Sequence, residues 1–102
     1  MHQMVESKLE AIAESCHRNH VRKAELFGSA TSNQFHPDHS DIDFLVSFDD
    51  LPPGEYADAY FGLLEDLQES FQRPVDIVVE STLKNPYFLQ EVQKSRTVLY
   101  AT

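Results

Sequence analysis

With 102 residues, the chain can build one modest hydrophobic core but not a second lobe for a large substrate, so we expect a single domain over residues 1–102. Its 17 acidic residues outnumber its 8 basic ones and give a formal charge of −9, which disfavours a nucleic-acid substrate or partner. One cysteine excludes an intramolecular disulfide, and no apolar run approaches the roughly 18 residues of a membrane span, so a cytoplasmic protein is expected.

The N-terminal part of the chain has the pattern of a helix followed by a strand. Apolar residues recur at helical spacing from about Met4 to Asn19, and this stripe includes Cys16, which we expect to be buried. A short extended run over residues 23–27 follows and stops at Gly28.

Residues 41–48 alternate as expected for a strand whose two faces differ. One face carries Ile42, Phe44 and Val46. The other face carries Asp41, Asp43 and Leu45, and we expect it to border a site.

Four further elements follow the Pro52-Pro53-Gly54 turn. A helix is expected to run from this turn to about Gln72, with an apolar stripe that we assign to the core: Tyr56, Tyr60, Leu63, Leu64, Leu67 and Phe71. Residues 75–79 predict a buried strand in which Asp76 is the single charge. Pro86 opens a last helix, where core packing is favoured for Tyr87 and Phe88, and residues 97–100 predict an edge strand.

This order of elements predicts an α/β (α+β) fold with a mixed sheet of about four strands flanked by helices. The first two strands are joined by a loop too short for a helical crossover, so they should not both run parallel to the rest of the sheet.

The carboxylates form a candidate metal site. Asp41 and Asp43 lie two positions apart on one strand, with Cα atoms roughly 6.5 Å apart on the same face, and Asp76 on a neighbouring strand could join them. Three such charges need a counterion, and hard oxygen ligands suit Mg²⁺ or Mn²⁺ rather than zinc. Two ions about 3.5–4 Å apart would fit the pair.

The Gly28-Ser29 turn supplies a candidate phosphate site beside the carboxylates. Glycine permits close approach of the backbone, and Ser29 offers a hydroxyl and an N–H to phosphate oxygens. An acceptor hydroxyl could then attack an α-phosphorus while pyrophosphate leaves. Asp76 could either bind the metal that activates this hydroxyl or take its proton.

Together, the segments LFGSAT, SDIDFLV and VDIVV resemble the nucleotidyltransferase superfamily related to DNA polymerase β, and in particular its minimal MNT-type members, which are paired with HEPN toxins. The resemblance implies that Gly28 and Ser29 hold the triphosphate of ATP, and that Asp41, Asp43 and Asp76 are the catalytic metal ligands, with two Mg²⁺ ions. It also implies an antitoxin that transfers AMP to a tyrosine of a HEPN-type toxin.

Two other functions stay open at this point. The chain could be a non-catalytic antitoxin that neutralises its partner by binding, or a small-molecule nucleotidyltransferase that acts with a second subunit. The loop Ala30–Ser40 is one residue longer than is usual in the family, and its first four positions, which are often basic or glycine in relatives, are Ala30, Thr31, Ser32 and Asn33, so weaker phosphate binding is expected.

Overall fold

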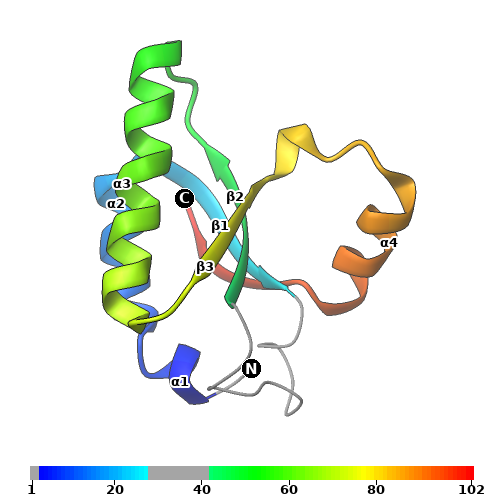
Figure 1. The fold of residues 1–102 in the computed structure, drawn as a ribbon, viewed down its shortest axis with the longest axis horizontal. Helices are drawn as coiled ribbons and strands as arrows, with labels where there is room; N and C mark the ends of the chain where they lie inside the picture. The colour runs from blue at the N-terminus through cyan, green and yellow to red at the C-terminus, as the bar shows by residue number, and fades with distance from the viewer. Residues whose placement is uncertain (1–2, 28–41) are drawn as a thin grey trace.

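The computed structural model describes residues 3–27 and 42–102. Within these ranges, four strands form one mixed sheet in the order β3-β2-β1-β4, where β1 pairs antiparallel with β2 and β4, and β2 pairs parallel with β3 (Figure 1). The strands are β1 (Val21–Phe27), β2 (Ile42–Phe48), β3 (Val75–Val79) and β4 (Thr97–Ala101). The mixed α+β architecture and the edge position of the last strand confirm the prediction.

Helices cover both faces of this sheet, but unequally. Figure 1 shows α2 and α3 together on one side and α4 alone on the other. The helical elements are α1 (Gln3–Glu6), α2 (Leu9–Arg18), α3 (Pro53–Phe71), the short 3₁₀ helix η2 (Glu80–Thr82) and α4 (Pro86–Ser95). None of the helices in the described ranges is both long and apolar enough to cross a bilayer.

The prediction of a single helix from Met4 to Asn19 is wrong in one respect, because the structure has two separate helices, α1 and α2, in this segment. The Ser7 hydroxyl donates to the Met4 carbonyl at 2.9 Å, and the Lys8 N–H donates to the Val5 carbonyl in a tight turn. Side-chain bonds of this kind compete with the regular helical ladder, which accounts for the break.

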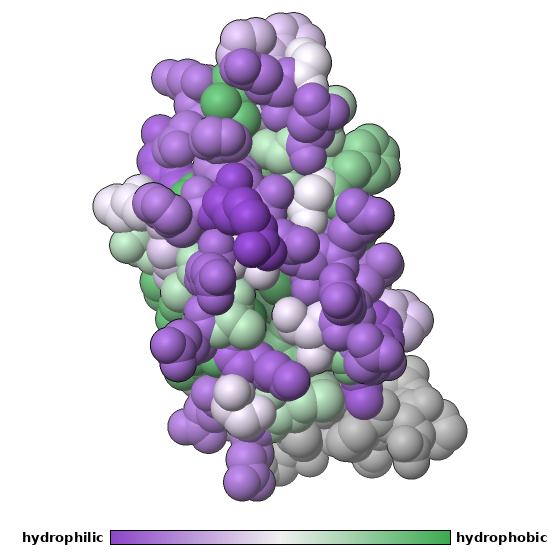
Figure 2. Space-filling view, turned by 90° about the vertical axis from the view of Figure 1, so that its left-hand side faces the viewer, coloured by the Kyte–Doolittle hydropathy of each residue, from purple (hydrophilic) through white to green (hydrophobic). Residues whose placement is uncertain are grey.

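The main core lies between the sheet and the pair α2 and α3. Its fully buried side chains include Val5, Ile12, Leu26, Ile42, Phe44, Leu63 and Leu67. Cys16 is buried there as predicted, and burial raises the pKa of its thiol to about 12. The surface that the helical side presents to solvent is mostly hydrophilic, with apolar side chains in scattered patches (Figure 2).

A smaller apolar cluster lies on the opposite face of the sheet, where Val92 of α4 packs against Phe27 and Leu45. The prediction that Tyr87 and Phe88 pack in the core is wrong, since 79% of Tyr87 and 37% of Phe88 are exposed. Phe88 lies one turn before Val92 on the same stripe of α4 and only partly reaches the sheet, whereas Tyr87 projects from a different side of the helix.

Candidate active site

Asp43 and Asp76 lie side by side on neighbouring strands. The parallel register of β2 and β3 pairs Asp43 with Asp76, and the antiparallel register of β1 and β2 pairs Asp43 with Phe27 on its other side. Paired residues on adjacent strands are about 4.8 Å apart and project to the same face. The sheet therefore carries a row of Phe27, Asp43 and Asp76, although more than thirty residues separate the two aspartates in sequence.

Strand alternation decides which face receives these carboxylates. Asp43 lies between Ile42 and Phe44, both fully buried in the main core, and Asp76 lies between the core residues Val75 and Ile77. Both aspartates must therefore project away from α2 and α3. We call the core side, with Leu26, Ile42, Phe44 and Val46, the closed face, and the side with Phe27, Asp43, Leu45 and Asp76 the open face.

A cleft of about 530 Å³ surrounds the two carboxylates, a size that suits a small-molecule ligand. Asp43 is half-buried in it and Asp76 is exposed. Among the described residues, the remaining lining is apolar or aromatic and comes from β1, α3, β3 and α4: Phe27, Tyr60, Leu64, Val75, Ile77, Val78 and Phe88. Tyr60 and Leu64 were expected to serve the core alone, but they also form a wall of this cleft.

The pair of carboxylates fits Mg²⁺, which proteins usually hold through one or two carboxylates together with substrate phosphates. No cluster of three or more potential metal-binding side chains occurs in residues 3–27 and 42–102. Of the other predicted site residues, Gly28, Ser29 and Asp41 lie outside the described residues. The structure thus brings together two of the five predicted residues, and the metal and phosphate roles stay predictions.

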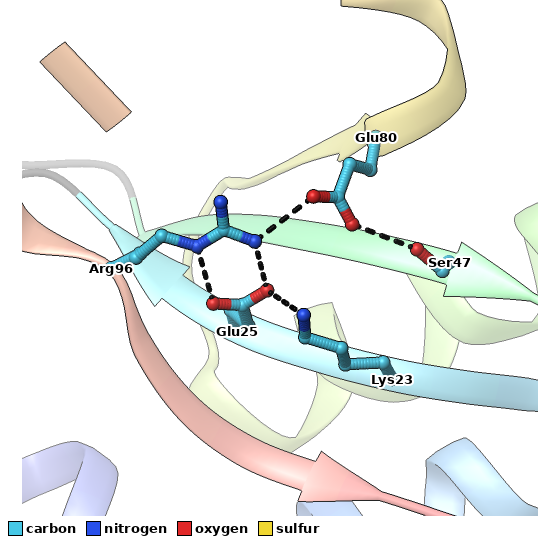
Figure 3. Close-up of polar contacts among 5 residues, drawn as sticks. All are labelled: Lys23, Glu25, Ser47, Glu80 and Arg96. Atoms are coloured by element: carbon cyan, nitrogen blue, oxygen red, sulfur yellow. Dashed lines mark hydrogen bonds and ion pairs between the residues drawn. The ribbon is translucent and has the colours of Figure 1, made fainter. Parts of the chain in front are cut away.

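Sequence reasoning missed a network of charged side chains on the open face (Figure 3). The Arg96 guanidinium donates to both carboxylate oxygens of Glu25 and, at 2.9 Å, to Glu80. Lys23 approaches Glu25 at 3.0 Å, and the Ser47 hydroxyl donates to Glu80 at 3.1 Å. These contacts connect β1, β2 and η2 with the chain just after α4.

Glu25 is the charged centre of this network and is only 2% exposed. The hydrogen bonds from Arg96 hold the pKa of Glu25 below its ordinary value and outweigh the opposite effect of burial, while Glu25 raises the pKa of Arg96. Because Glu80 precedes α4 and Arg96 follows it, the network fixes both ends of the segment that carries α4. One sequence signal was available: a glutamate inside the apolar run Ala24–Phe27 needs a cationic partner.

Comparison with known proteins matches residues 9–99 to the nucleotidyltransferase domain family. Two proteins of Methanocaldococcus jannaschii are similar over 74 residues. "Putative protein adenylyltransferase MJ0128" is 32% identical, over 72% of this chain and 71% of its own, and "Putative protein adenylyltransferase MJ1379" is 28% identical, over 72% of each chain.

Solved structures extend this similarity to the fold. A structure described as a putative minimal nucleotidyltransferase superposes with a TM-score of 0.74 at 26% identity and covers 95% of both chains. A toxin-antitoxin structure with AMP-PNP has a TM-score of 0.70 at 25% identity, over 92% of this chain and 73% of the other. The fold is also shared, with a TM-score of 0.64, by a chain in a complex of tri-AMPylated Shewanella oneidensis HEPN toxin with MNT antitoxin. The two chains are 22% identical, and the match covers 95% of this chain and 72% of that one.

The match over residues 9–99 and the similarity to a minimal member over nearly the whole chain agree with the position of the paired carboxylates on the sheet. The chain belongs to the nucleotidyltransferase domain family and has the fold of its minimal members.

Proposed function

We propose that this chain is a Mg²⁺-dependent nucleotidyltransferase that moves AMP from ATP onto a tyrosine hydroxyl of a HEPN-type toxin, and so acts as its antitoxin in the cytoplasm. The observation that carries this proposal is the pairing of Asp43 with Asp76 inside an open cleft, in a chain of the nucleotidyltransferase family. Support for a protein acceptor comes from the names of the two archaeal relatives. The similar toxin-antitoxin structure with AMP-PNP supports the nucleotide.

In this proposal, Asp41, Asp43 and Asp76 would hold the metal ions, and Gly28 and Ser29 would hold the triphosphate. Bound Mg²⁺ supplies charge neutralisation at the phosphates and at the leaving pyrophosphate.

The tyrosine oxygen attacks the α-phosphorus, and a new phosphorus–oxygen bond forms. The bond between the α-phosphorus and the bridging oxygen breaks, and pyrophosphate leaves with the electron pair. Asp76 accepts the phenolic proton and passes it to solvent, a role that suits an exposed carboxylate on an edge strand. The same exposure leaves Asp76 accessible to an acceptor as large as a protein.

The experiment incubates the chain with ATP labelled in its α-phosphate, Mg²⁺ and the protein encoded beside it, and follows both label transfer and neutralisation of toxicity. We expect wild-type protein to label and neutralise the partner, and Asp43→Asn to do neither. If Asp43→Asn neutralises fully and no label moves in either reaction, the chain is an antitoxin that acts by binding. Label on a small molecule instead of the partner would also contradict the proposal.

A further inference from the structure

Two adjacent aromatic residues of α4 are unburied, one inside the cleft and the other outside it. Among the described residues, the large apolar side chains that stay exposed are Phe61, Tyr87, Phe88 and Val98. Tyr87 and Phe88 belong to the first turn of α4, and Phe88 lines the same cleft as Asp43 and Asp76. Exposed aromatics placed together beside a site typically mark an interaction surface.

The first turn of α4 is held in a fixed conformation. The Asn85 side chain accepts hydrogen bonds from the backbone N–H groups of Tyr87, at 2.9 Å, and Phe88, at 3.4 Å, and Pro86 occupies the first helical position. The Phe88 ring meets Phe27 edge to face, with ring centroids 5.9 Å apart. The backbone of both residues and the ring of Phe88 are therefore positioned before any ligand arrives.

The rest of α4 is anchored to the sheet as well. Val92, on the same stripe as Phe88, is 1% exposed against Leu45 and Phe27, and Arg96 fastens the end of the helix to Glu25 and Glu80. A helix fixed at both ends does not need exposed aromatics for its own packing. Exposed aromatic side chains lower the solubility of a protein, and this cost is removed when a second molecule covers them.

We propose that Phe88 inside the cleft and Tyr87 beside it form an aromatic platform for the partner protein, in which Phe88 packs against the phenol ring of the acceptor tyrosine and Tyr87 contacts the protein surface around it. This inference rests on the proposed function and names the residues that hold its acceptor. Aromatic rings pack favourably at centroid distances of 4.5–7 Å, and Phe88 lines the same cleft as Asp43 and Asp76, so a phenol ring packed against Phe88 would lie in the cleft that holds the carboxylates.

A protein fits this platform better than the base of a nucleotide does. Tyr87 is 79% exposed and does not line the cleft, so a base within the cleft would leave it uncovered. A protein surface around the acceptor tyrosine would cover both residues at once. Buried aromatic anchors of this kind carry much of the binding energy in protein interfaces.

The test compares Tyr87→Ala and Phe88→Ala with Phe61→Ala, which removes an equally bulky ring that is 62% exposed on α3 and does not line the cleft. Calorimetry gives the Kd of the neighbouring-gene partner and, separately, of Mg²⁺-AMP-PNP. The label assay gives kcat and KM for the partner. We expect Tyr87→Ala and Phe88→Ala each to raise the Kd and KM of the partner about tenfold. In Phe61→Ala these two quantities should stay within twofold of wild type, and so should the Kd of AMP-PNP in all three variants.

The outcomes separate this inference from the proposed function. Weaker partner binding in both α4 variants, with no label transferred by wild-type protein, would refute AMP transfer but keep the platform as the docking site for the partner. Weaker AMP-PNP binding by Phe88→Ala with unchanged partner affinity would assign the ring to the nucleotide and overturn the inference. Unchanged partner affinity in both variants, or an equal loss in Phe61→Ala, would overturn it too.

Discussion

The two faces of the sheet have different functions, although the same strands contribute side chains to both. On the closed face, Ile42 and Phe44 are fully buried beneath two helices. On the open face, Asp43 emerges from between them, next to Asp76 and only partly covered by α4. Because strand side chains alternate, a seven-residue strand can contribute to both the core and the site.

Stability and reactivity are therefore separable in this molecule. The closed face excludes water from a contiguous apolar cluster, whereas the described residues of the open face form a small cluster of Phe27, Leu45 and Val92 beside the charged groups. Functional sites commonly lie where structure is less tightly packed. Substitutions of the apolar residues on the closed face should change the free energy of unfolding, and substitutions of the aspartates on the open face should change catalysis.

The largest expected effect is catalytic. Asp76→Asn keeps the shape of the side chain but removes its charge and its capacity to accept a proton, so AMP transfer should fall about 10²–10⁴-fold. Because Asp76 is exposed, the free energy of unfolding should change by less than about 0.5 kcal/mol. Single-turnover labelling and urea unfolding measure the two quantities. If Asp76→Asn strongly destabilised the protein while its folded molecules kept the wild-type rate of AMP transfer, the separation of stability and catalysis between the two faces would be contradicted.

Phe44→Ala should have the opposite effect. It leaves a cavity in the closed face, where the ring packs near Phe71 at a centroid distance of 6.1 Å, and should lower the free energy of unfolding by about 3–5 kcal/mol. Urea unfolding at neutral pH measures this loss. A change below about 1 kcal/mol would mean that the closed face is not the main source of stability.

Arg96→Met should cost less, about 3 kcal/mol, because Lys23 remains beside the buried Glu25 carboxylate. The pKa of Glu25 is lowered in the folded protein, so its stabilising effect is fully present above the ordinary value of 4.5 and is lost as pH falls through the folded pKa. The stability difference between wild type and Arg96→Met should therefore shrink from pH 7 to about pH 3 in urea unfolding. The same difference at both pH values would exclude Glu25 as the partner that matters.

The smallest effect concerns the contact between α2 and α3. A Cβ at Gly62 would lie 2.4 Å from the Asn19 side-chain oxygen, and the Asn19 amide is already bonded to Asp66 and to the Ser15 carbonyl. Gly62→Ala should therefore cost about 1–3 kcal/mol despite the better helix propensity of alanine.

Gly54→Ala is the matched control, because no atom lies within 4 Å of its added Cβ, and it should be neutral or stabilising by up to about 1 kcal/mol. Thermal unfolding compares the two variants. A gain in stability for Gly62→Ala would show that the two helices adjust freely and that the closed face is less rigid than its packing indicates.

Local patterns predicted most of the fold. The strand 75–79 agrees with β3 to the residue, and the alternation of residues 41–48 correctly separated Ile42 and Phe44 from Asp43. These features depend on side-chain period alone. The register that pairs Asp43 with Asp76 could be expected only as proximity, because it is set by how two distant strands align.

Features that depend on contacts between distant segments were not predictable. The Arg96–Glu25–Glu80 network joins three separate parts of the chain, and no spacing rule connects them. The exposure of Tyr87 depends on how α4 is rotated on the sheet, which a short apolar stripe does not determine. Gly28, Ser29 and Asp41 lie outside the described residues, so their part of the site stays a prediction.

Mass spectrometry of the partner protein tests AMP transfer by the open face most directly. The partner is incubated with ATP, Mg²⁺ and either the wild-type chain or the Asp43→Asn, Asp76→Asn double variant, and the intact mass and modified peptide are determined. We predict that wild-type protein adds AMP to a tyrosine of the partner and that the double variant adds none. A partner left unmodified by folded wild-type protein, or modified equally by the double variant, would contradict a catalytic role for these carboxylates.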